Sequence, residues 1–596
     1  MKGLCSPLVL LVAVLGRLGG GSWADGHSLV RRGANIPGPE NFVRHRYPTV
    51  VAFDDYLYID GGELLQQVNG TETNSTQLSQ SYSSYALNST LSLGLNESWT
   101  NETAEFRSIQ KTAPLLDQQI YWTDTRINTF YTWGGKAVGS ATPPANELWL
   151  FNGDGTGGGA WSQVPQGDFR DFSRLRRPVG SSFTQTAHAG YALGGQVTSE
   201  TDSSIQKANP GYALPGLVSY DFQTSQWTNI STVGYQGSGY GTNLNGRAEY
   251  IPFGPNGLLL FFGGAETPVD ATDESIVQLL WNMLWLYDPV TGKWYNQMTT
   301  TTGGIPRPPQ MERACSVGVE GPNNTYEIFI YGGTSDQLGV ITSDVYVLSL
   351  PGFVFFRANS AGTPRADHAC VVVGKGKRQM LSYGGVDGGS GLRSSTTTPD
   401  PWRQGLGIFD MTEMRWTDSY DPNAINYEPP ADVNSWYVRG GMDKVVWSSD
   451  EVKQLFVNGT ITYGGNSNSS STENSDDSRS GRRIGGIVGG TVGGVIVLTA
   501  ACAGTFVLLR RRRRRQSAVS EEISEYRPEP WPKDTPRLRS TTPGTMMTLE
   551  PTPIEPVEIS GIARGELPGE DVDWAYELPV PTPRMRPELP DRKYTF

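Results

Sequence analysis

Residues that could bind a metal ion are scarce in this sequence. Its 596 residues include four histidines and four cysteines, and Cys370 follows His368 by two positions. Imidazole and thiolate groups are good metal ligands, but a zinc site needs a set of them at characteristic spacings, which this chain lacks. The apolar, strand-like stretch around His368 and Cys370 predicts buried structural residues instead. The histidines are His27, His45, His188 and His368.

Other patterns that indicate catalysis are also missing. The sequence contains no phosphate-binding loop, no nucleophile-elbow motif and no recognisable pair of glycosidase carboxylates. Its net charge of −12 disfavours nucleic acid as a partner. We therefore predict no catalytic, cofactor-binding or metal-binding residue, no cofactor and no nucleic-acid partner.

The N-terminus has the composition of a secretory signal peptide. Lys2 precedes an apolar core from Leu8 to Leu15, and Ser22-Trp23-Ala24 offers small side chains to a signal peptidase. We predict a signal over 1–24, cleaved after Ala24, and a leader over 25–40. Arg31-Arg32 in the leader is either a dibasic processing site or a pair of exposed arginines.

A second apolar segment, 484–509, contains no charged residue. At 1.5 Å per residue a helix of this length extends about 39 Å, which is enough for one tilted membrane crossing. Arginines fill positions 510–515, and this positive charge predicts that the C-terminus is cytoplasmic. We expect a type I single-pass protein of the plasma membrane or another secretory-pathway membrane.

Glycines within this membrane segment predict helix packing. Gly485, Gly489 and Gly493 share one four-residue register, and small residues at that spacing let two helices approach closely. A homodimer through the membrane helix is one hypothesis, and a span that merely tolerates glycine is the other.

The acceptor pattern Asn-x-Ser/Thr recurs on one side of the membrane segment only. This distribution predicts a glycosylated extracellular region. The predicted N-glycosylation sites are Asn69, Asn74, Asn88, Asn96, Asn101, Asn229, Asn323, Asn458 and Asn468.

An internal repeat runs through the region before the membrane segment. Each unit has a strand-like run that ends in Gly-Gly, and a second run follows that leads to a tryptophan, or to Phe356 in the fifth unit. An arginine often opens the unit. The glycines are Gly61, Gly62, Gly134, Gly135, Gly194, Gly195, Gly263, Gly264, Gly332, Gly333, Gly384 and Gly385, and the tryptophans are Trp99, Trp161, Trp227, Trp294 and Trp416.

This pattern resembles the kelch repeat, whose units are the four-stranded blades of a β-propeller. Stacking such sheets in a ring buries faces that one sheet cannot bury alone. The stretches "IYGG", "VYVLSLPGF", "QMLSYGG" and "IFDMTEMRW" are similar to a group of fungal single-pass kelch-repeat membrane proteins. The resemblance implies an all-β kelch-type propeller over 41–440, a fungal source, and no defined activity.

The repeat units are compatible with either six or seven blades. Six units are complete, and a seventh doublet, Gly464-Gly465, has no tryptophan unit after it. Ser448, three residues before Glu451, forms a capping-box pattern that predicts a short helix there. We favour six blades, with the helix and a Ser/Asn-rich juxtamembrane linker over 441–483, while N-terminal residues could still complete a seventh blade.

The remaining cysteines and the tail complete the prediction. Cys5 leaves with the signal and Cys502 lies in the membrane segment, so Cys315 and Cys370 are the extracellular cysteines. They occupy equivalent places in consecutive units, where a Cα separation of about 5.5 Å, which a disulfide prefers, is not assured, so their redox state stays open. The Pro-rich tail, 510–596, is predicted to be disordered, with Thr-Pro sites for a kinase. A possible SH3-domain ligand within the tail comprises Arg584, Pro587 and Pro590.

Two functions fit this organisation. The first is a type I surface glycoprotein whose propeller binds an extracellular protein or glycan in recognition, adhesion or sensing, through loops such as Glu63 to Asn88 and Thr267 to Trp281. The second is a secretory-pathway enzyme, either a glycan hydrolase or a copper-radical oxidase. The resemblance implies that such an oxidase would need two histidines and a tyrosine-cysteine cross-link, and four histidines are few for it. We favour the non-enzymatic function.

Overall fold

The computed structural model describes residues 40–68, 81–138, 141–166, 169–206, 211–236, 240–269, 276–388 and 399–457. The chain divides into two units, Met1–Ser470 and Ser471–Phe596, and all described residues belong to the first. The predicted signal, membrane segment and tail lie outside them. No helix among the described residues is long and apolar enough to cross a membrane.

Six antiparallel sheets, here called blades 1 to 6, form a β-propeller. Each blade uses four strands that are consecutive in its sheet and follow chain order. The strands are, in blade 1, β2 (Thr49–Phe53), β3 (Tyr56–Asp60), β6 (Ser89–Gly94) and β8 (Arg107–Gln110); in blade 2, β9 (Leu116–Asp124), β10 (Thr129–Ala137), β11 (Trp149–Gly153) and β12 (Gly159–Gln163); in blade 3, β13 (Ser182–Gln185), β14 (Ala189–Leu193), β17 (Leu217–Asp221) and β18 (Trp227–Ile230); in blade 4, β19 (Arg247–Ile251), β20 (Leu258–Phe262), β23 (Met283–Asp288) and β24 (Lys293–Met298); in blade 5, β26 (Cys315–Glu320), β27 (Tyr326–Tyr331), β30 (Val345–Leu350) and β31 (Val354–Arg357); and in blade 6, β32 (Ala369–Val373), β33 (Gln379–Tyr383), β34 (Leu406–Asp410) and β35 (Arg415–Thr417).

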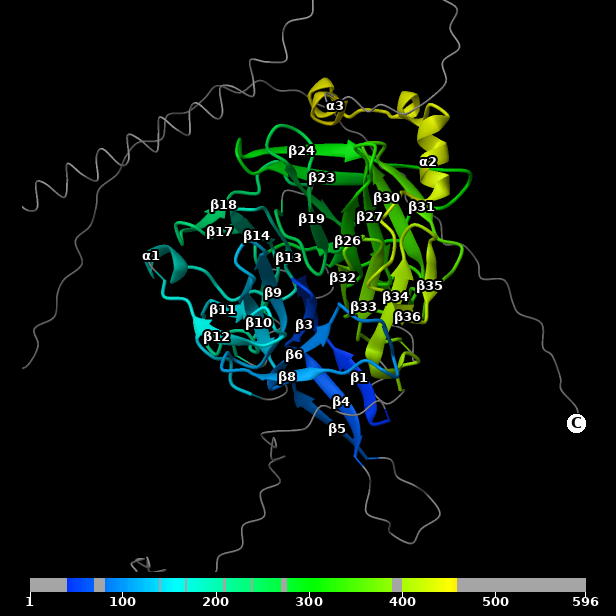
Figure 1. Ribbon diagram of the computed structural model, residues 1–596. Helices are drawn as coiled ribbons and strands as arrows, with labels where there is room; N and C mark the ends of the chain where they lie inside the picture. Colours follow the sequence, from blue (N-terminus) through cyan, green and yellow to red (C-terminus); the bar gives the residue numbers. More distant parts are fainter. Residues whose placement is uncertain are drawn as a thin grey trace, which may run out of the picture. The chain divides into compact units, whose positions relative to one another are not determined.

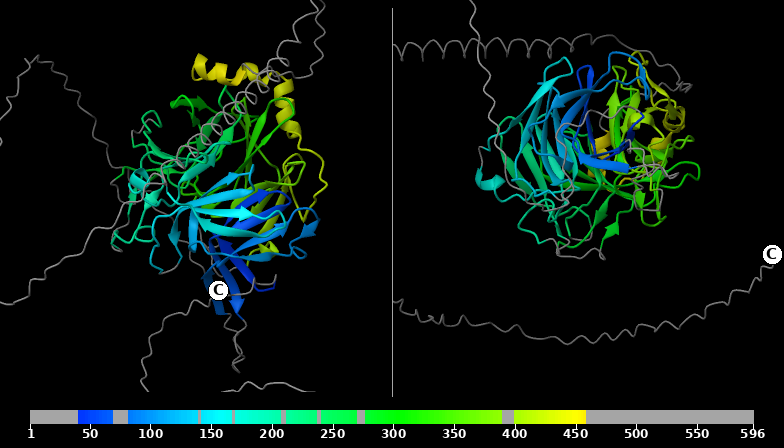
Figure 2. Two further views of the ribbon diagram at one scale, coloured as in Figure 1. Left: turned by 60° about the vertical axis from the view of Figure 1, so that its left-hand side comes forward. Right: turned by 90° about the horizontal axis from the view of Figure 1, so that it is seen from below.

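The blades follow one another around a common centre, and blade 6 returns to blade 1 (Figures 1 and 2). The first strands of neighbouring blades lie side by side in the order β2, β9, β13, β19, β26 and β32, and β32 again lies beside β2. These strands therefore form the inner wall of the ring. The prediction of six blades is confirmed.

The Gly-Gly doublets join each blade to the next. All twelve glycines have positive φ, between 61° and 108°, a conformation that side chains disfavour. The N–H of each second glycine donates to a carbonyl at or just before the start of the inner strand of the next blade, as in Gly333 N to Arg365 O at 2.8 Å. A Cβ on Gly332 would lie 2.1 Å from that same oxygen. The other donor and acceptor pairs are Gly62 and Leu116, Gly135 and Pro178, Gly195 and Asn243, Gly264 and Met311, and Gly385 and His45.

Aromatic side chains fill the spaces between blades. Trp227 in the outer strand of blade 3 packs between blades 2 and 3, with its ring centroid 4.9 Å from that of Trp133. Trp161, Trp294 and Trp416 hold similar positions at three other junctions. In blade 5 the strand register places Phe355 opposite Leu348, where blade 4 has Trp294 opposite Tyr287, so the counterpart is Phe355 and not Phe356.

Trp99 closes the ring instead of belonging to an outer strand. It lies in β7 (Trp99–Thr100), which pairs with β36 (Ser419–Tyr420) after blade 6. The rings of Trp99 and Tyr420 stack with their centroids 5.0 Å apart, within a cluster shared by blades 6 and 1. The outer strand of blade 1 is β8, and Phe106 beside it packs against this cluster.

Short strands surround the edge of the ring where the Gly-Gly doublets lie. The N-terminal strand β1 does not start a seventh blade, because it pairs with a hairpin inserted after Gly62. Two-residue ribbons follow the doublets of blades 3, 4 and 5. These strands are β1 (Phe42–Arg46), β4 (Glu63–Val68), β5 (Ser81–Ala86), β15 (Gln196–Val197), β16 (Tyr212–Ala213), β21 (Ala265–Glu266), β22 (Val277–Gln278), β28 (Thr334–Ser335) and β29 (Val340–Ile341), and a further strand, β25 (Thr300–Thr301), pairs with β31.

Helical elements near the end of the described chain pack on blades 4 and 5 (Figure 1). The predicted short helix is α3, and Phe456 in it contacts Phe253 and Phe353, so this helix forms part of the propeller body. The predicted cap is wrong by one residue: the Ser449 hydroxyl accepts the Val452 N–H at 3.1 Å, whereas Ser448 bonds to β24. The helical elements are α1 (Phe169–Phe172), η2 (Arg403–Gly405), α2 (Ala431–Val438), η3 (Gly441–Lys444) and α3 (Asp450–Val457).

Candidate functional site at the mouth of the central cavity

In every blade one residue adopts a left-handed backbone conformation: in five blades it lies two positions before the inner strand, and in blade 2 it is the third residue of β9. These six residues, which we call the left-handed ring, occupy the same register position in the six blades. A non-glycine residue rarely adopts this conformation, which costs about 1–3 kcal/mol, and such residues cluster at functional sites. The members of the ring are Tyr47, Gln118, Gly180, Asn245, Arg313 and Asp367.

Backbone hydrogen bonds connect members of the left-handed ring across blade boundaries. Tyr47 N donates to Asp367 O at 2.9 Å, Arg313 N to Asn245 O at 2.9 Å, and Asn245 N to Gly180 O at 2.6 Å. Asp367 N donates to Arg313 O at 3.3 Å. The strained conformation is therefore held by the ring itself, and its side chains are fixed around one opening.

That opening leads into a central cavity of about 470 Å³ lined by the inner strands of all six blades. This volume lies in the range of small-molecule sites. Deeper in the cavity Ser316 Oγ donates to Glu249 Oε1 at 2.7 Å. Burial raises the pKa of Glu249 to about 7, although its surface is partly exposed to the cavity. Burial also lowers the pKa of Arg247 to about 10.

Charged groups of both signs lie at the mouth. Arg313 Nη1 is 3.5 Å from Asp367 Oδ2, and Asn245 Nδ2 donates to Glu312 Oε2 at 2.9 Å. The pKa of Arg313 is raised, mainly by the nearby Asp367 carboxylate. Burial raises the pKa of Asp367, and Arg313 opposes this shift. Since the Arg313 side chain is 39% exposed, its guanidinium can contact a ligand while it remains paired.

Buried acceptors without protein partners lie beside Gln118. Among the described residues, Asp117 Oδ1 and Gln119 Oε1 have no hydrogen-bond partner. Burial raises the pKa of Asp117 to about 7, and Lys136 opposes this shift. Lys136 also lies 5.7 Å from the ring centroid of Tyr47. The mouth therefore combines cationic, aromatic and hydrogen-bonding groups, a combination that can hold a polar ligand.

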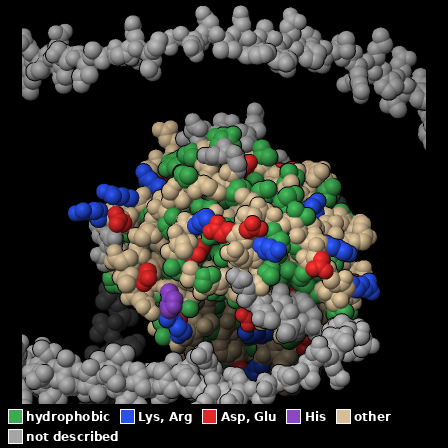
Figure 3. All heavy atoms as spheres, turned by 90° about the horizontal axis from the view of Figure 1, so that it is seen from above, with side chains coloured by type: hydrophobic (Ala, Val, Ile, Leu, Met, Phe, Trp, Pro, Cys, Tyr) green, Lys and Arg blue, Asp and Glu red, His purple; other side chains and the backbone are tan. Residues whose placement is uncertain are grey.

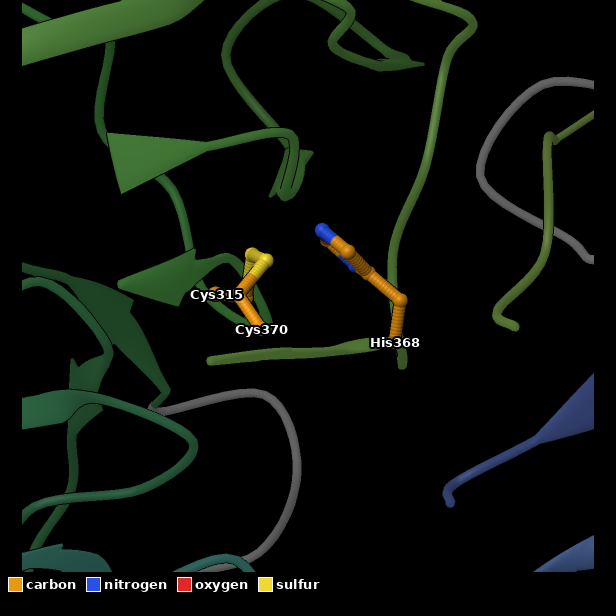
Figure 4. A group of neighbouring side chains, drawn as sticks. All are labelled: Cys315, His368 and Cys370. Atoms are coloured by element: carbon orange, nitrogen blue, oxygen red, sulfur yellow. A yellow bond between two sulfur atoms is a disulfide. The ribbon is translucent and has the colours of Figure 1, made fainter. Parts of the chain in front are cut away.

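The structure describes three of the histidines and two of the cysteines. His45 Nδ1 lies 3.1 Å from Tyr383 Oη, and Nε2 lies 2.8 Å from Gly61 O. Burial lowers the pKa of His45 to about 4. Cys315 and Cys370 form a disulfide between the inner strands of blades 5 and 6, and His368 lies next to it (Figure 4). His188 is exposed, and His27 lies outside the described residues.

Sequence reasoning misjudged two features of these residues. Cys315 pairs with Tyr331 and Cys370 with Ser382, so the cysteines are one residue apart in register and not equivalent. This offset places their Cα atoms 5.6 Å apart. The arginines that open the units also hold different positions. Arg313 is a member of the left-handed ring. Arg365 lies two residues before the ring member Asp367, and it pairs with Asp400.

The predicted glycosylation sites that the structure describes all reach the surface. Asn96 and Asn229 are exposed, and Asn88, Asn101 and Asn323 are partly exposed. On the face shown in Figure 3, basic and acidic side chains are interspersed among apolar ones. The sequons at Asn69, Asn74, Asn458 and Asn468, the helix-packing glycines Gly485, Gly489 and Gly493, and the motif of Arg584, Pro587 and Pro590 lie outside the described residues.

No family model matches the chain, and no curated protein matches it. The propeller is therefore established by the strand pairing and the ring of inner strands.

Proposed function

We propose that this protein is a type I membrane glycoprotein with a kelch-type extracellular propeller that binds a ligand at the left-handed ring. The observation that carries the proposal is the convergence of five strained non-glycine residues around one cavity mouth. Strain of this kind persists where the surrounding structure holds functional groups in place. The short ribbons after the Gly-Gly doublets surround the same edge of the ring and enlarge the contact surface.

The chemistry of the mouth favours a polar ligand, either a glycan or a loop of an extracellular protein. Arg313 and Asn245 supply donors, while the Gln118 amide and the Asp367 carboxylate, which line the same cavity, supply acceptors. Glycan hydroxyl groups both donate and accept, so they suit such a mixed set. The aromatic ring of Tyr47 adds an apolar surface next to these groups.

The test is a binding screen of the purified full chain against glycans, cell-wall polymers and surface proteins. For any ligand found, Arg313→Asn removes the cation and keeps a residue that tolerates the left-handed conformation. We expect a loss of affinity of about 10- to 100-fold, as for one charged hydrogen bond. Arg174→Asn removes an exposed arginine just after α1, in the connection between blades 2 and 3, and serves as the matched control. Equal affinity of the two variants would contradict the proposed site.

The alternative function, a copper-radical oxidase, is less well supported. Its tyrosine-cysteine cross-link needs a free cysteine, and the disulfide occupies both cysteines of the described residues. Metal analysis of the purified protein distinguishes the two functions, because stoichiometric copper would favour the oxidase.

We further propose that residues 484–509 anchor the propeller and form a homodimer, and that the tail binds a kinase or an SH3 domain. These proposals rest on the glycine spacing and on the proline motifs of the sequence. Self-association in a membrane assay should fall when Gly489 and Gly493 are replaced by Leu. Unchanged association would exclude the glycine interface.

A further inference from the structure

A group of metal-ligating side chains lies outside the left-handed ring. Cys315 in β26, Cys370 in β32 and His368 just before β32 each offer one ligand atom, and these atoms lie within 4.8 Å of one another. Figure 4 shows the imidazole ring of His368 beside the two sulfur atoms. Two adjacent inner strands therefore bring two sulfurs and one ring nitrogen to a single point.

His368 is buried beside the disulfide with few polar contacts. The residue is 3% exposed, and its ring nitrogens have no side-chain hydrogen-bond partner within the described part of the chain, where the Tyr331 backbone is the polar group beside the ring. Its ring contacts Tyr331 edge-on, with the centroids 5.1 Å apart. Buried polar groups nearly always have partners, and a histidine that has only the Tyr331 backbone beside it keeps a ring nitrogen available for a metal ion.

The site is open to the central cavity, because Cys315, His368 and Cys370 all line its wall. Reduced cysteines bind metal ions as thiolates. Two thiolates would also balance the charge of a divalent cation.

We propose that, when its disulfide is reduced, this site binds one zinc ion through Cys315 Sγ, Cys370 Sγ and a ring nitrogen of His368. Three protein ligands leave the fourth tetrahedral position for a water molecule from the cavity, as in zinc sites with an open position. Zinc accepts both sulfur and imidazole ligands. The proposal goes beyond ligand binding at the left-handed ring and does not depend on it.

The chemistry has two balanced steps. A phosphine reductant and one water molecule convert the disulfide into two thiols, and the phosphorus is oxidised to phosphine oxide. Zinc then replaces the two thiol protons, which are released to solvent, and the neutral imidazole donates its nitrogen lone pair. The disulfide form lacks thiolates and should not bind zinc at this site.

Cobalt(II) is the probe, because thiolate coordination gives this ion a charge-transfer absorption band. The full chain in detergent is reduced with a phosphine, freed of reductant without air, and titrated with Co²⁺. We expect one cobalt per chain with a thiolate band, loss of the band when Zn²⁺ is added, and no band before reduction. A reduced chain that gives no thiolate band, or that loses its native circular dichroism spectrum, overturns the proposal.

Variants locate the site within the chain. Cys315→Ser should abolish the thiolate band, and His368→Ala should weaken cobalt binding at least about 10-fold. Cys502→Ser and His188→Ala are the matched controls and should leave the band and the affinity unchanged. A band that survives Cys315→Ser, or that disappears in Cys502→Ser, would place the metal elsewhere and overturn the proposal.

Discussion

The contact between Gly332 and Arg365 offers a direct test of how the blades are joined. In Gly332→Ala the new Cβ would lie 2.1 Å from Arg365 O of the next blade, and φ is +69°. The left-handed conformation costs an alanine about 1–2 kcal/mol. Displacing a packed backbone carbonyl adds about 1–3 kcal/mol, and weakening the Gly333 to Arg365 hydrogen bond adds about 1 kcal/mol.

Gly339→Ala is the matched control for this substitution. Gly339 has φ of +67°, nearly the same as Gly332, and a Cβ there would meet nothing within 4 Å. It should cost only the conformational term of about 1–2 kcal/mol, against about 3–6 kcal/mol for Gly332→Ala. Denaturant unfolding of both variants measures the difference. Equal losses of stability would refute the explanation that the doublets are glycine because the next blade lies against them.

Three further substitutions test other buried contacts. Glu327 is fully buried, accepts the hydroxyls of Ser349 and Tyr427, and has its pKa raised by burial from 4.5 to about 7. Because the unfolded chain ionises first, stability should fall by about 3 kcal/mol between pH 4.5 and 7 and then level off. Glu327→Gln should remove this part of the pH dependence in unfolding measurements. An unchanged dependence of stability on pH would contradict the assignment of this loss to Glu327. Lys111→Met leaves the buried carboxylate of Asp60 without its ion pair and should cost about 3–5 kcal/mol, part of which Asp60→Asn in the same chain should restore. Trp227→Ala should cost about 3–5 kcal/mol at the junction of blades 2 and 3 by thermal unfolding, and a loss below about 1 kcal/mol would contradict its packing role.

The sequence allowed the ring to be predicted because its construction depends on residue types. Leu258–Phe262 is a buried strand followed by Gly263-Gly264, as expected, and the same arrangement recurs because only glycine fits beside the next blade. The outer strands of the blades are harder to align with one another from the sequence. Phe355 and Phe356 are both aromatic, and only the pairing with β30 shows which one occupies the tryptophan position.

The candidate site could not be predicted in the same way. Tyr47, Gln118, Asn245, Arg313 and Asp367 share a backbone conformation and a register, but no side-chain property. A sequence pattern based on residue type therefore does not detect them.

The disulfide was also undetermined, because its formation depends on a one-residue offset between Cys315 and Cys370. For the group of metal-ligating side chains, the one indication in the sequence is the short spacing between His368 and Cys370.

Hydrogen exchange with a ligand bound tests the central claim most directly. The full chain is compared with and without a ligand found in the binding screen. The account predicts slower amide exchange around the members of the left-handed ring, at residues 45–48, 116–119, 178–181, 243–246, 311–314 and 365–368. Protection confined to the opposite turns, at 53–56, 252–257 and 373–378, would contradict ligand binding at the left-handed ring.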